Sequence, residues 1–488
     1  MRPFLVISLL GLCFSEVEAW AQLDRSHIVS SPFVLSSDYR ALGFNPSLMT
    51  LEGWNGGHRK TRGGLEGGLS IKSDFLNNDE VWRQFFGTSS EDVGRWTAAE
   101  WSAALAEEQL EISGAFLTAA FSHKLGTWAV SYANRRGSQA EIELGERTAK
   151  LFADGGLDLY SDIQLVESGE VVSVADYDFS LGDAWTGLTL AGEETLANLL
   201  DGTRLRYQSV RSHDVGISKS WNGIGDWQLH TGIGGRLLLG SSYFELEGGD
   251  GEVTAFAAKS GGLAWNQLQA LHGMLSSGWT FDVVDLLNPA GKGWSMDVGA
   301  TLAHDNRAWV SASLVDVGWM EWEGATYDVN DLHVGTSNWG SSDAAVDPDQ
   351  WVSGALQSLS PDAWFTAGDT AIRRVANRPL FSLGGAWMPA RAIVFAGHAT
   401  IRNREALAMG GASGGLALGV RLTQALTAEL GVQRMSNDAM RIPASLRLSM
   451  SRGWQTGVRV GDISAFWKGS QPEVAAQFCF LRYQFLER

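Results

Sequence analysis

The run Gly411-Ala412-Ser413-Gly414-Gly415 places a serine among small residues, as in the nucleophile elbow of serine hydrolases. Such an elbow needs a strand, a sharp turn and then a helix, which together leave the hydroxyl group exposed. The segment that follows these glycines has strand periodicity instead of a helical pattern. We therefore interpret the run as part of a loop between Ile401 and Leu416 and assign no catalytic residue to the chain.

Acidic residues between positions 328 and 349 could supply the oxygen ligands that calcium requires, about six to eight in number. The set consists of Asp328, Asn330, Asp331, Asp343, Asp347 and Asp349. Their spacing is not that of an EF-hand, and a hydrated acidic loop is the favoured interpretation. None of the 9 histidines stands four residues from another, and the chain has 2 cysteines. The sequence therefore predicts no metal and no cofactor.

A second group of charged residues lies at alternate positions of strand-like segments, opposite apolar residues. The group consists of Lys72, Asp74, Asp297, Arg421, Glu429 and Arg447. If these segments close into a barrel with the polar face inward, the six side chains face the lumen, where a charge meets water, a partner charge or a solute. Their signs are mixed, so we favour mutual pairing over solute binding and predict no selectivity filter.

Period-two alternation positions these charges, because successive side chains of a strand point to opposite faces. In Ser295 to Ala303, apolar Met296 and Val298 alternate with Ser295 and Asp297. The predicted strands are Leu65–Phe75, Leu110–Phe121, Thr127–Asn134, Ser212–Trp221, Trp227–Leu239, Ser295–Ala303, Ala308–Val315, Pro379–Trp387, Ala392–Ile401, Gly415–Thr423, Leu426–Arg434, Ser445–Met450, Thr456–Asp462 and Val474–Phe485. A soluble sandwich also alternates, but segments of about nine to eleven residues suit tilted strands that cross a bilayer.

The start of the chain has the pattern of a secretory signal peptide. Arg2 precedes an apolar run from Pro3 to Phe14, and Ala19-Trp20-Ala21 supplies a cleavage site, so residues 1–21 are predicted to be removed. Cys479 then remains as the only cysteine and no internal disulfide can form. The net charge of -18 argues against binding to nucleic acid.

We predict an all-β chain that forms a transmembrane antiparallel barrel of about 14 strands in a Gram-negative outer membrane. An even strand number places both chain ends on the periplasmic side. The 58 glycines and 21 tryptophans favour a barrel, because glycine suits bent strands and tryptophan the membrane interface. Two stretches without alternation, 140–202 and 319–377, are predicted as outer loop inserts with some helix, and Trp96 to Gln109 as a further helix.

The N-terminal string Ala41-Leu42-Gly43-Phe44-Asn45-Pro46-Ser47-Leu48 resembles that of FadL-like outer-membrane barrels. With the Gly293–Ala300 segment and the later glycine-rich strands, the chain looks like an uncharacterised domain-of-unknown-function family of Bacteroidota outer-membrane proteins, related to the FadL-like and PorV-like barrels. The resemblance implies a barrel over residues 63–488 and an inward plug over residues 22–62, with Asn45 and Pro46 at the turn of the plug.

Three functions follow as hypotheses. The first is a plugged channel for small or hydrophobic molecules, and its alternative is a non-transporting barrel that docks or shuttles exported proteins, as in type IX secretion. An enzyme is the least favoured. The expected partners are outer-membrane lipid, the barrel-assembly machinery, and either a hydrophobic small molecule or an exported protein. Gly232, Gly234 and Gly235 could mark a bulge that opens the wall sideways, or only a bend.

Overall fold

The computed structural model describes most of the strand-forming part of the chain. The described ranges are 37–51, 61–73, 104, 106, 110–149, 162–165, 168–173, 185–188, 196–223, 225–249, 252–259, 289–305, 307–329, 365–377, 379–402, 412–434, 440–450, 454–466 and 473–485. The chain is mostly β, and one large antiparallel sheet dominates it. The predicted signal peptide lies outside the described residues.

The main sheet closes on itself. The strands that form the ring pair in chain order, and the last of them, β20, pairs both with β19 and with the first strand, β1. Within the described part of the chain the ring has fourteen members: β1 (Thr61–Ser73), β2 (Leu110–Leu125), β3 (Trp128–Glu143), β7 (Arg204–Asn222), β8 (Trp227–Gly249), β10 (Gly291–His304), β11 (Ala308–Val329), β13 (Leu380–Ala390), β14 (Ile393–Arg402), β15 (Ala412–Arg421), β16 (Leu426–Arg434), β18 (Ala444–Ser449), β19 (Trp454–Val460) and β20 (Glu473–Phe485). Each predicted strand overlaps one member of this ring.

Three further strands continue ring positions and add none. The strand β9 (Glu252–Lys259) pairs with the far half of β8, while β10 pairs with its near half. In the same way β12 (Phe365–Ala376) and β13 share β11, and β17 (Met440–Arg441) and β18 share β16. The two strands of each pair lie end to end along the same neighbour and share one ring position, which explains why a sheet of 17 strands closes as a ring of fourteen.

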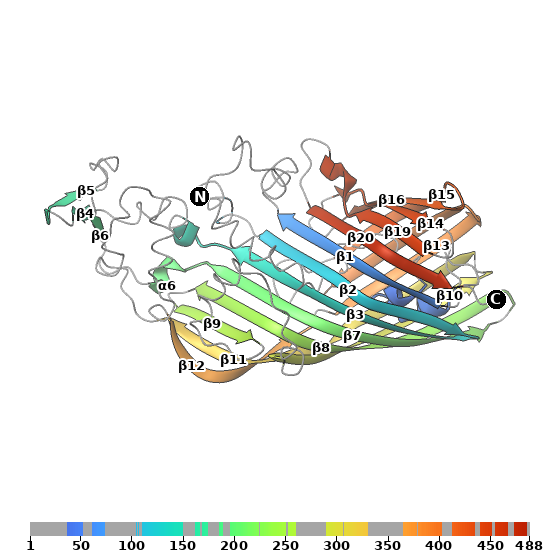
Figure 1. Cartoon of the computed structure of the whole chain (residues 1–488), viewed down its shortest axis with the longest axis horizontal. Helices are drawn as coiled ribbons and strands as arrows, with labels where there is room; N and C mark the ends of the chain where they lie inside the picture. The colour runs from blue at the N-terminus through green and yellow to red at the C-terminus, as the bar shows by residue number, and fades with distance from the viewer. Residues whose placement is uncertain are drawn as a thin grey trace.

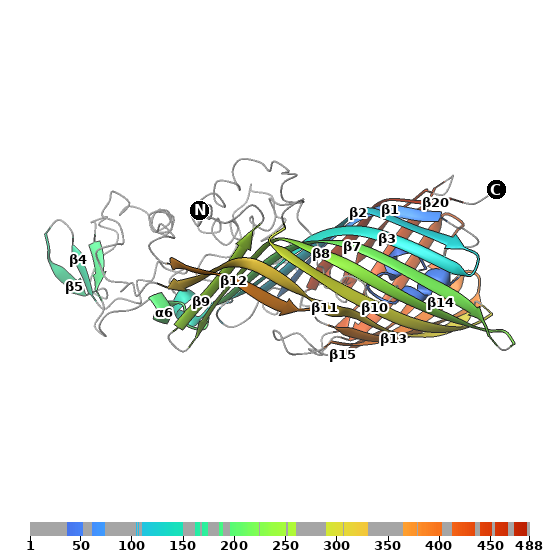
Figure 2. The ribbon, with the colours of Figure 1, turned by 90° about the horizontal axis from the view of Figure 1, so that it is seen from below.

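The two faces of the ring differ sharply in composition. Along β10 the buried side chains are Ser295, Asp297 and Thr301, whereas Met296 and Val298 are more than 40% exposed. Polar residues therefore face the barrel axis and apolar residues face outward, which is the reverse of a soluble barrel core. Figures 1 and 2 show tilted strands around an interior that holds the N-terminal segment.

The two ends of the barrel are also unlike. At one end short turns join β2 to β3, β7 to β8, β10 to β11, β13 to β14 and β15 to β16. At the other end β7, β8, β9, β11 and β12 extend beyond their neighbours, and a small separate sheet lies further out (Figures 1 and 2). That sheet has the order β5 (Val171–Ser173), β4 (Asp162–Leu165) and β6 (Trp185–Leu188).

Regular structure reaches further into the predicted inserts than the alternation indicated. β3 continues to Glu143 and β11 to Val329, and β12 lies wholly inside the range 319–377. The first insert contains α6 (Leu196–Leu199), and some helix was predicted for this insert. Of the helix predicted before β2, only residues 104 and 106 are described, and both are helical.

The hypothesis of a bulge at Gly232, Gly234 and Gly235 is wrong. β8 pairs with β7 and β10 through these glycines without a register shift, and its irregularity lies instead near Ser241. Among the described residues, no helix has the length and apolarity required to span a bilayer.

Candidate functional site

Residues 37–51, here called the plug, lie inside the ring near the short turns (Figures 1 and 2). The plug contains two 3-10 helices, η2 (Tyr39–Ala41) and η3 (Pro46–Thr50). Asn45 caps η3, because its side-chain oxygen accepts hydrogen bonds from the Ser47 N–H at 3.1 Å and the Ser47 hydroxyl at 2.6 Å. Pro46 suits the first helical position, where no N–H is needed. Gly43 has φ +79, a conformation that favours glycine.

Polar side chains of the wall hold the plug from several directions. The Ser47 hydroxyl lies 2.6 Å from that of Thr301 on β10, and Thr50 contacts His230 Nδ1 on β8 at 2.9 Å. Other contacts reach the plug's backbone oxygens: Lys124 Nζ to Leu51 at 2.7 Å, Arg135 Nη2 to Tyr39 at 3.2 Å, and Ser313 Oγ to Phe44 at 2.5 Å. The anchors belong to five strands, so the plug has one defined position in the lumen.

Apolar plug residues form a core with the wall at the same level. Leu42, Leu48 and Met49 are almost fully buried. They belong to a cluster whose wall members are mainly alanines together with Trp309 on β11. Small inward residues are required here, because the lumen must contain both the wall side chains and a folded segment. This packing joins the plug and the wall in one buried apolar cluster at the turn end.

Three glycines of the wall leave space for the plug, for its backbone at Gly232 and for its side chains at Gly216 and Gly299. A Cβ on Gly299 would lie 2.0 Å from Asn45 Oδ1, and one on Gly232 would lie 2.4 Å from the carbonyl carbon of Pro46. A Cβ on Gly216 would meet Leu42 at 2.3 Å. Gly232 therefore serves close approach and not a lateral opening.

Asp297 joins the plug to a break in the wall. Its Oδ2 accepts the N–H of Gly43 at 3.0 Å, and its Oδ1 accepts the N–H of Asp316 at 3.0 Å. Asp316 lies in a bulge of β11 with φ +62, opposite Asp297 in the strand pairing. Arg236 of β8 contacts both carboxylates at 2.5 Å. The predicted lumen residue Asp297 is thus fully engaged in structural bonds.

Glu66 plays a similar part on β1. The pairings of β1 with both neighbours shift register beside Glu66, which is buried. Its Oε1 accepts the hydroxyl of Tyr39 at 2.7 Å and Nε of Arg40 at 2.8 Å. Two irregular points of the wall, at Glu66 and at Asp316, therefore turn polar groups toward the plug.

Glu429 and Arg447, both predicted to face the lumen, lie together on β16 and β18. Glu429 Oε1 is 3.3 Å from Arg447 Nη2, and its Oε2 is 3.8 Å from Arg459 on β19. Ser445 donates a further hydrogen bond to Glu429 at 2.9 Å. The carboxylate and the two guanidinium groups thus form a partly balanced cluster in the wall.

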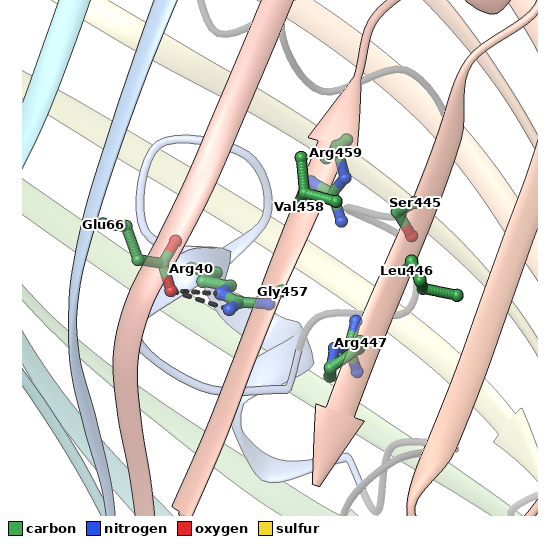
Figure 3. Close-up of a pocket in the computed structure, with 8 residues that line it drawn as sticks. All are labelled: Arg40, Glu66, Ser445, Leu446, Arg447, Gly457, Val458 and Arg459. Carbon is green, nitrogen blue, oxygen red and sulfur yellow. Dashed lines mark hydrogen bonds and ion pairs between the residues drawn. The ribbon is translucent and has the colours of Figure 1, made fainter.

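A pocket separates this cluster from the plug. It encloses about 340 Å³, open solvent included. Figure 3 shows Arg40 and Glu66 on one side of it, and Arg447, Arg459 and Ser445 on the other. The pocket is therefore bounded partly by the plug, and a shift of the plug would enlarge it.

The other predicted residues lie apart from this site. Arg421 ends β15 beside a short turn and is half-buried, and its backbone N–H donates to the Ala392 oxygen at 2.8 Å. Lys72 is in β1, whereas Asp74 and most of the acidic stretch lie outside the described residues. Ser413 is in β15 and not in a loop, and its hydroxyl lies 2.6 Å from that of Thr400. No group of three or more potential metal ligands occurs in the described ranges.

Sequence reasoning missed Arg236, Asp316 and Glu66. Each is defined by a contact to a residue distant in sequence, and Glu66 and Asp316 lie where a bulge interrupts the alternation. Gly299 and Thr301 were both visible on the polar face of their strand. Only the position of the plug distinguishes them from other small inward residues.

Several solved structures align with most of the chain at low identity. The chain aligns with the Pseudomonas putida toluene transporter TodX at TM-score 0.41 and 8% identity, over 93% of this chain and 96% of that one. A Pseudomonas aeruginosa FadL homologue aligns at TM-score 0.44 and 9% identity, over 96% and 99%. The translocator domain of the Neisseria meningitidis autotransporter NalP gives 0.31 and 8%, over 87% and 88%.

These scores and identities are too low to transfer an activity or a substrate to this chain. No curated protein matches it. Residues 180–386, which extend from the first insert through most of β13, match the model of a family of unknown function, DUF5723.

Proposed function

We propose that the chain is an outer-membrane β-barrel channel for small or hydrophobic molecules, and that residues 37–51 keep it closed. The observation that carries this proposal is the closed ring with apolar side chains outside and a bonded segment inside. A closed ring satisfies all backbone groups between strands, which is a requirement for strands in lipid.

The outer apolar side chains form a belt of suitable height. On β10 the belt runs from Trp294 to Leu302, about 26 Å along the strand at about 3.3 Å per residue. A strand tilt of about 40° reduces this to about 20 Å across the layer, near the roughly 25 Å of known barrels. Exposed apolar residues continue the belt over the strands from β2 to β19 whose side chains the structure describes.

Aromatic residues mark both edges of the belt. Trp128, Trp221, Trp227 and Trp387 are exposed near the short turns, and Trp294 is exposed toward the other end. Lys219 Nζ lies 3.7 Å from the ring centre of Trp221 and 4.8 Å from that of Trp128. Tryptophan and lysine together suit the headgroup layer. The short turns are assigned to the periplasmic side, because outer-membrane barrels have short turns on that side and longer loops outside.

Deletion of the plug tests the channel. Mature protein lacking residues 22–51 should admit small sugars in a liposome-swelling assay, whereas the full mature protein should admit far less. Deletion removes the core around Leu48 and Met49 and the inner boundary of the pocket beside Arg447. A folded deletion variant that stays closed would refute the channel and favour the docking alternative, which partner capture would then address.

A reversible crosslink provides a sharper control. Ser47→Cys and Thr301→Cys, in a Cys479→Ser background, replace hydroxyl oxygens that are 2.6 Å apart, so the sulfurs come within bonding reach. The oxidised protein should show the lowest permeability, and reduction should restore the level of the background variant. Equal permeability in both states would mean that the plug does not move for transport.

A further inference from the structure

A pair of arginines faces outward at the upper edge of the apolar belt. Arg136 on β3 lies directly opposite Arg211 on β7 in the strand pairing. Arg211 shares its face of β7 with Val215 and Ile217, which are 54% and 41% exposed, because residues two apart point the same way. Arg136, as its cross-strand partner, lies on that outer face too.

The residues that surround the arginine pair are apolar on one side and polar on the other. In the same row across the sheet, Phe116 is next to Arg136 and Leu239 is next to Arg211. The next row toward the long loops pairs Ser138 with Ser209. Ser138 is half-buried and Ser209 is buried, so the run of exposed apolar side chains ends at the two arginines. In the proposed membrane location this is the height at which lipid headgroups would meet the belt.

A hydrogen-bond network orders the arginine on β7. Arg211 Nε donates to Asn134 Oδ1 at 3.3 Å, and the Thr118 hydroxyl donates to the same oxygen at 2.8 Å. His213 Nδ1 contacts the Tyr132 hydroxyl at 2.9 Å and Asn134 Nδ2 at 3.2 Å. Because the bond to Asn134 uses Nε, the remaining donors of Arg211 lie on its terminal nitrogens.

We propose that Arg136 and Arg211 bind the phosphate group of an anionic lipid in the outer leaflet. Like charges directly opposite each other repel, and a phosphate between them would replace that repulsion by charge-assisted hydrogen bonds. The apolar neighbours Phe116 and Leu239 offer contact to the acyl chains, which a free phosphate ion lacks. The inference rests on the proposed membrane location, but it requires no transport.

Lipid titration of the closed mature protein tests this site. Protein in zwitterionic micelles is titrated with a short-chain phosphatidic acid, with the matching phosphatidylcholine as reference. A basic residue near a lipid surface contributes about 1 kcal/mol, so Arg136→Gln or Arg211→Gln should raise the Kd about fivefold each and the double variant about 25-fold. Equal binding of both lipids to the wild-type protein would overturn the proposal.

Arg434 provides a matched control. It is an exposed arginine on the outward face of β16, and its pairing partners are Gly414 and Met440, so it has no second arginine opposite. Arg434→Gln should leave the Kd of the Arg136–Arg211 site within about twofold, because Arg434 is on β16 and does not border the site on β3 and β7. A loss as large as that of Arg211→Gln would overturn the assignment to the pair. Displacement of the lipid by equimolar inorganic phosphate would identify a free-anion site instead.

Thermal stability supplies a second readout that a damaged fold cannot imitate. In phosphatidylcholine micelles Arg211→Gln should change Tm little, because the loss of the hydrogen bond to Asn134 and the relief of repulsion from Arg136 act in opposite directions. In phosphatidic acid the same variant should melt below the wild-type protein. An equal loss in both lipids would indicate a purely structural role for Arg211. Since this assay needs no permeability, its outcome is independent of the channel proposal.

Discussion

At the residue scale, glycine on the inner wall governs whether the plug can seat. The Cβ positions at Gly216, Gly232 and Gly299 are all occupied by plug atoms. The glycine content that favoured a barrel in the sequence thus has a local cause at these positions, which is the space that the plug occupies.

Gly299→Ala should displace the turn at Asn45 and increase liposome permeability, because the new methyl group would lie 2.0 Å from Asn45 Oδ1. Overpacking of this kind costs about 1–3 kcal/mol. Gly235→Ala is the control, since no atom lies within 4 Å of its Cβ position. Equal permeability of the two variants would show that the contact at Gly299 does not hold the plug.

The buried ion pair between Arg236 and Asp297 should matter far more than the exposed pair between Arg204 and Glu247. Asp297→Ala leaves a buried guanidinium with Asp316 as its remaining partner and should cost about 3–5 kcal/mol in urea unfolding from lipid vesicles. Glu247→Ala should cost about 0–1 kcal/mol, although its carboxylate lies 2.7 Å from Arg204, because both groups are exposed. Similar losses for the two variants would contradict this reading of burial.

At the element scale, alternation located the fourteen ring strands but missed β9, β12 and β17 of the same sheet and the three strands of the small sheet. Each segment predicted from period-two spacing overlaps a strand of the ring, and the segment Leu426–Arg434 coincides with β16. Strand ends were less predictable. β8 runs to Gly249 and β11 to Val329, because these strands continue above the belt, where their outer faces need not be apolar.

The extension of β8 has its own buried network. Tyr243 packs against Trp322 and Phe256, and burial raises the pKa of Tyr243 to about 12. Its hydroxyl is therefore protonated and donates to Glu245 at 3.0 Å. These residues escaped sequence reasoning, because the β8 irregularity near Ser241 reverses which alternate positions face inward.

The interrupted strand β9–β10 should tolerate excision of its insertion. Gly291 pairs with Gly240 and Lys259 with Ser242, so the two ends meet β8 at almost adjacent positions. On β11, Trp322 pairs with Gly291 and Ala325 pairs with Ala257. The two β11 residues between them would face Ala258 and Lys259, so the shortened strand would keep the register of both halves.

Protein with Lys259 joined directly to Gly291 should therefore form the same ring and show the faster gel migration of an unheated folded barrel. Deletion of Gly291–His304, which removes a ring strand, should abolish that migration. If the first deletion also fails to fold, the excised segment contributes to closure of the ring.

At the scale of the whole molecule, the outer belt predicts how charge is tolerated. Val298→Arg, in the middle of the belt, should cost about 2–4 kcal/mol in lipid vesicles, whereas Leu422→Arg, beside a short turn, should cost about 0–1 kcal/mol. Both side chains are well exposed in the isolated molecule. Two equally small losses would mean that solvent and not lipid covers this face.

The pairing of β1 with β20, which closes the ring, has a consequence for biogenesis. The first strand pairs with the last, Thr61 with Phe485, so the cylinder cannot close until the C-terminal strand has been synthesised. The plug precedes the first strand in sequence and is enclosed in the finished ring. It must therefore already lie on the concave side of the unfinished sheet when β1 pairs with β20. The residues that bind it, Thr301, His230 and Asp297, belong to strands in the middle of the chain. The plug can thus act as an internal template on which the curved sheet is assembled before its edges join.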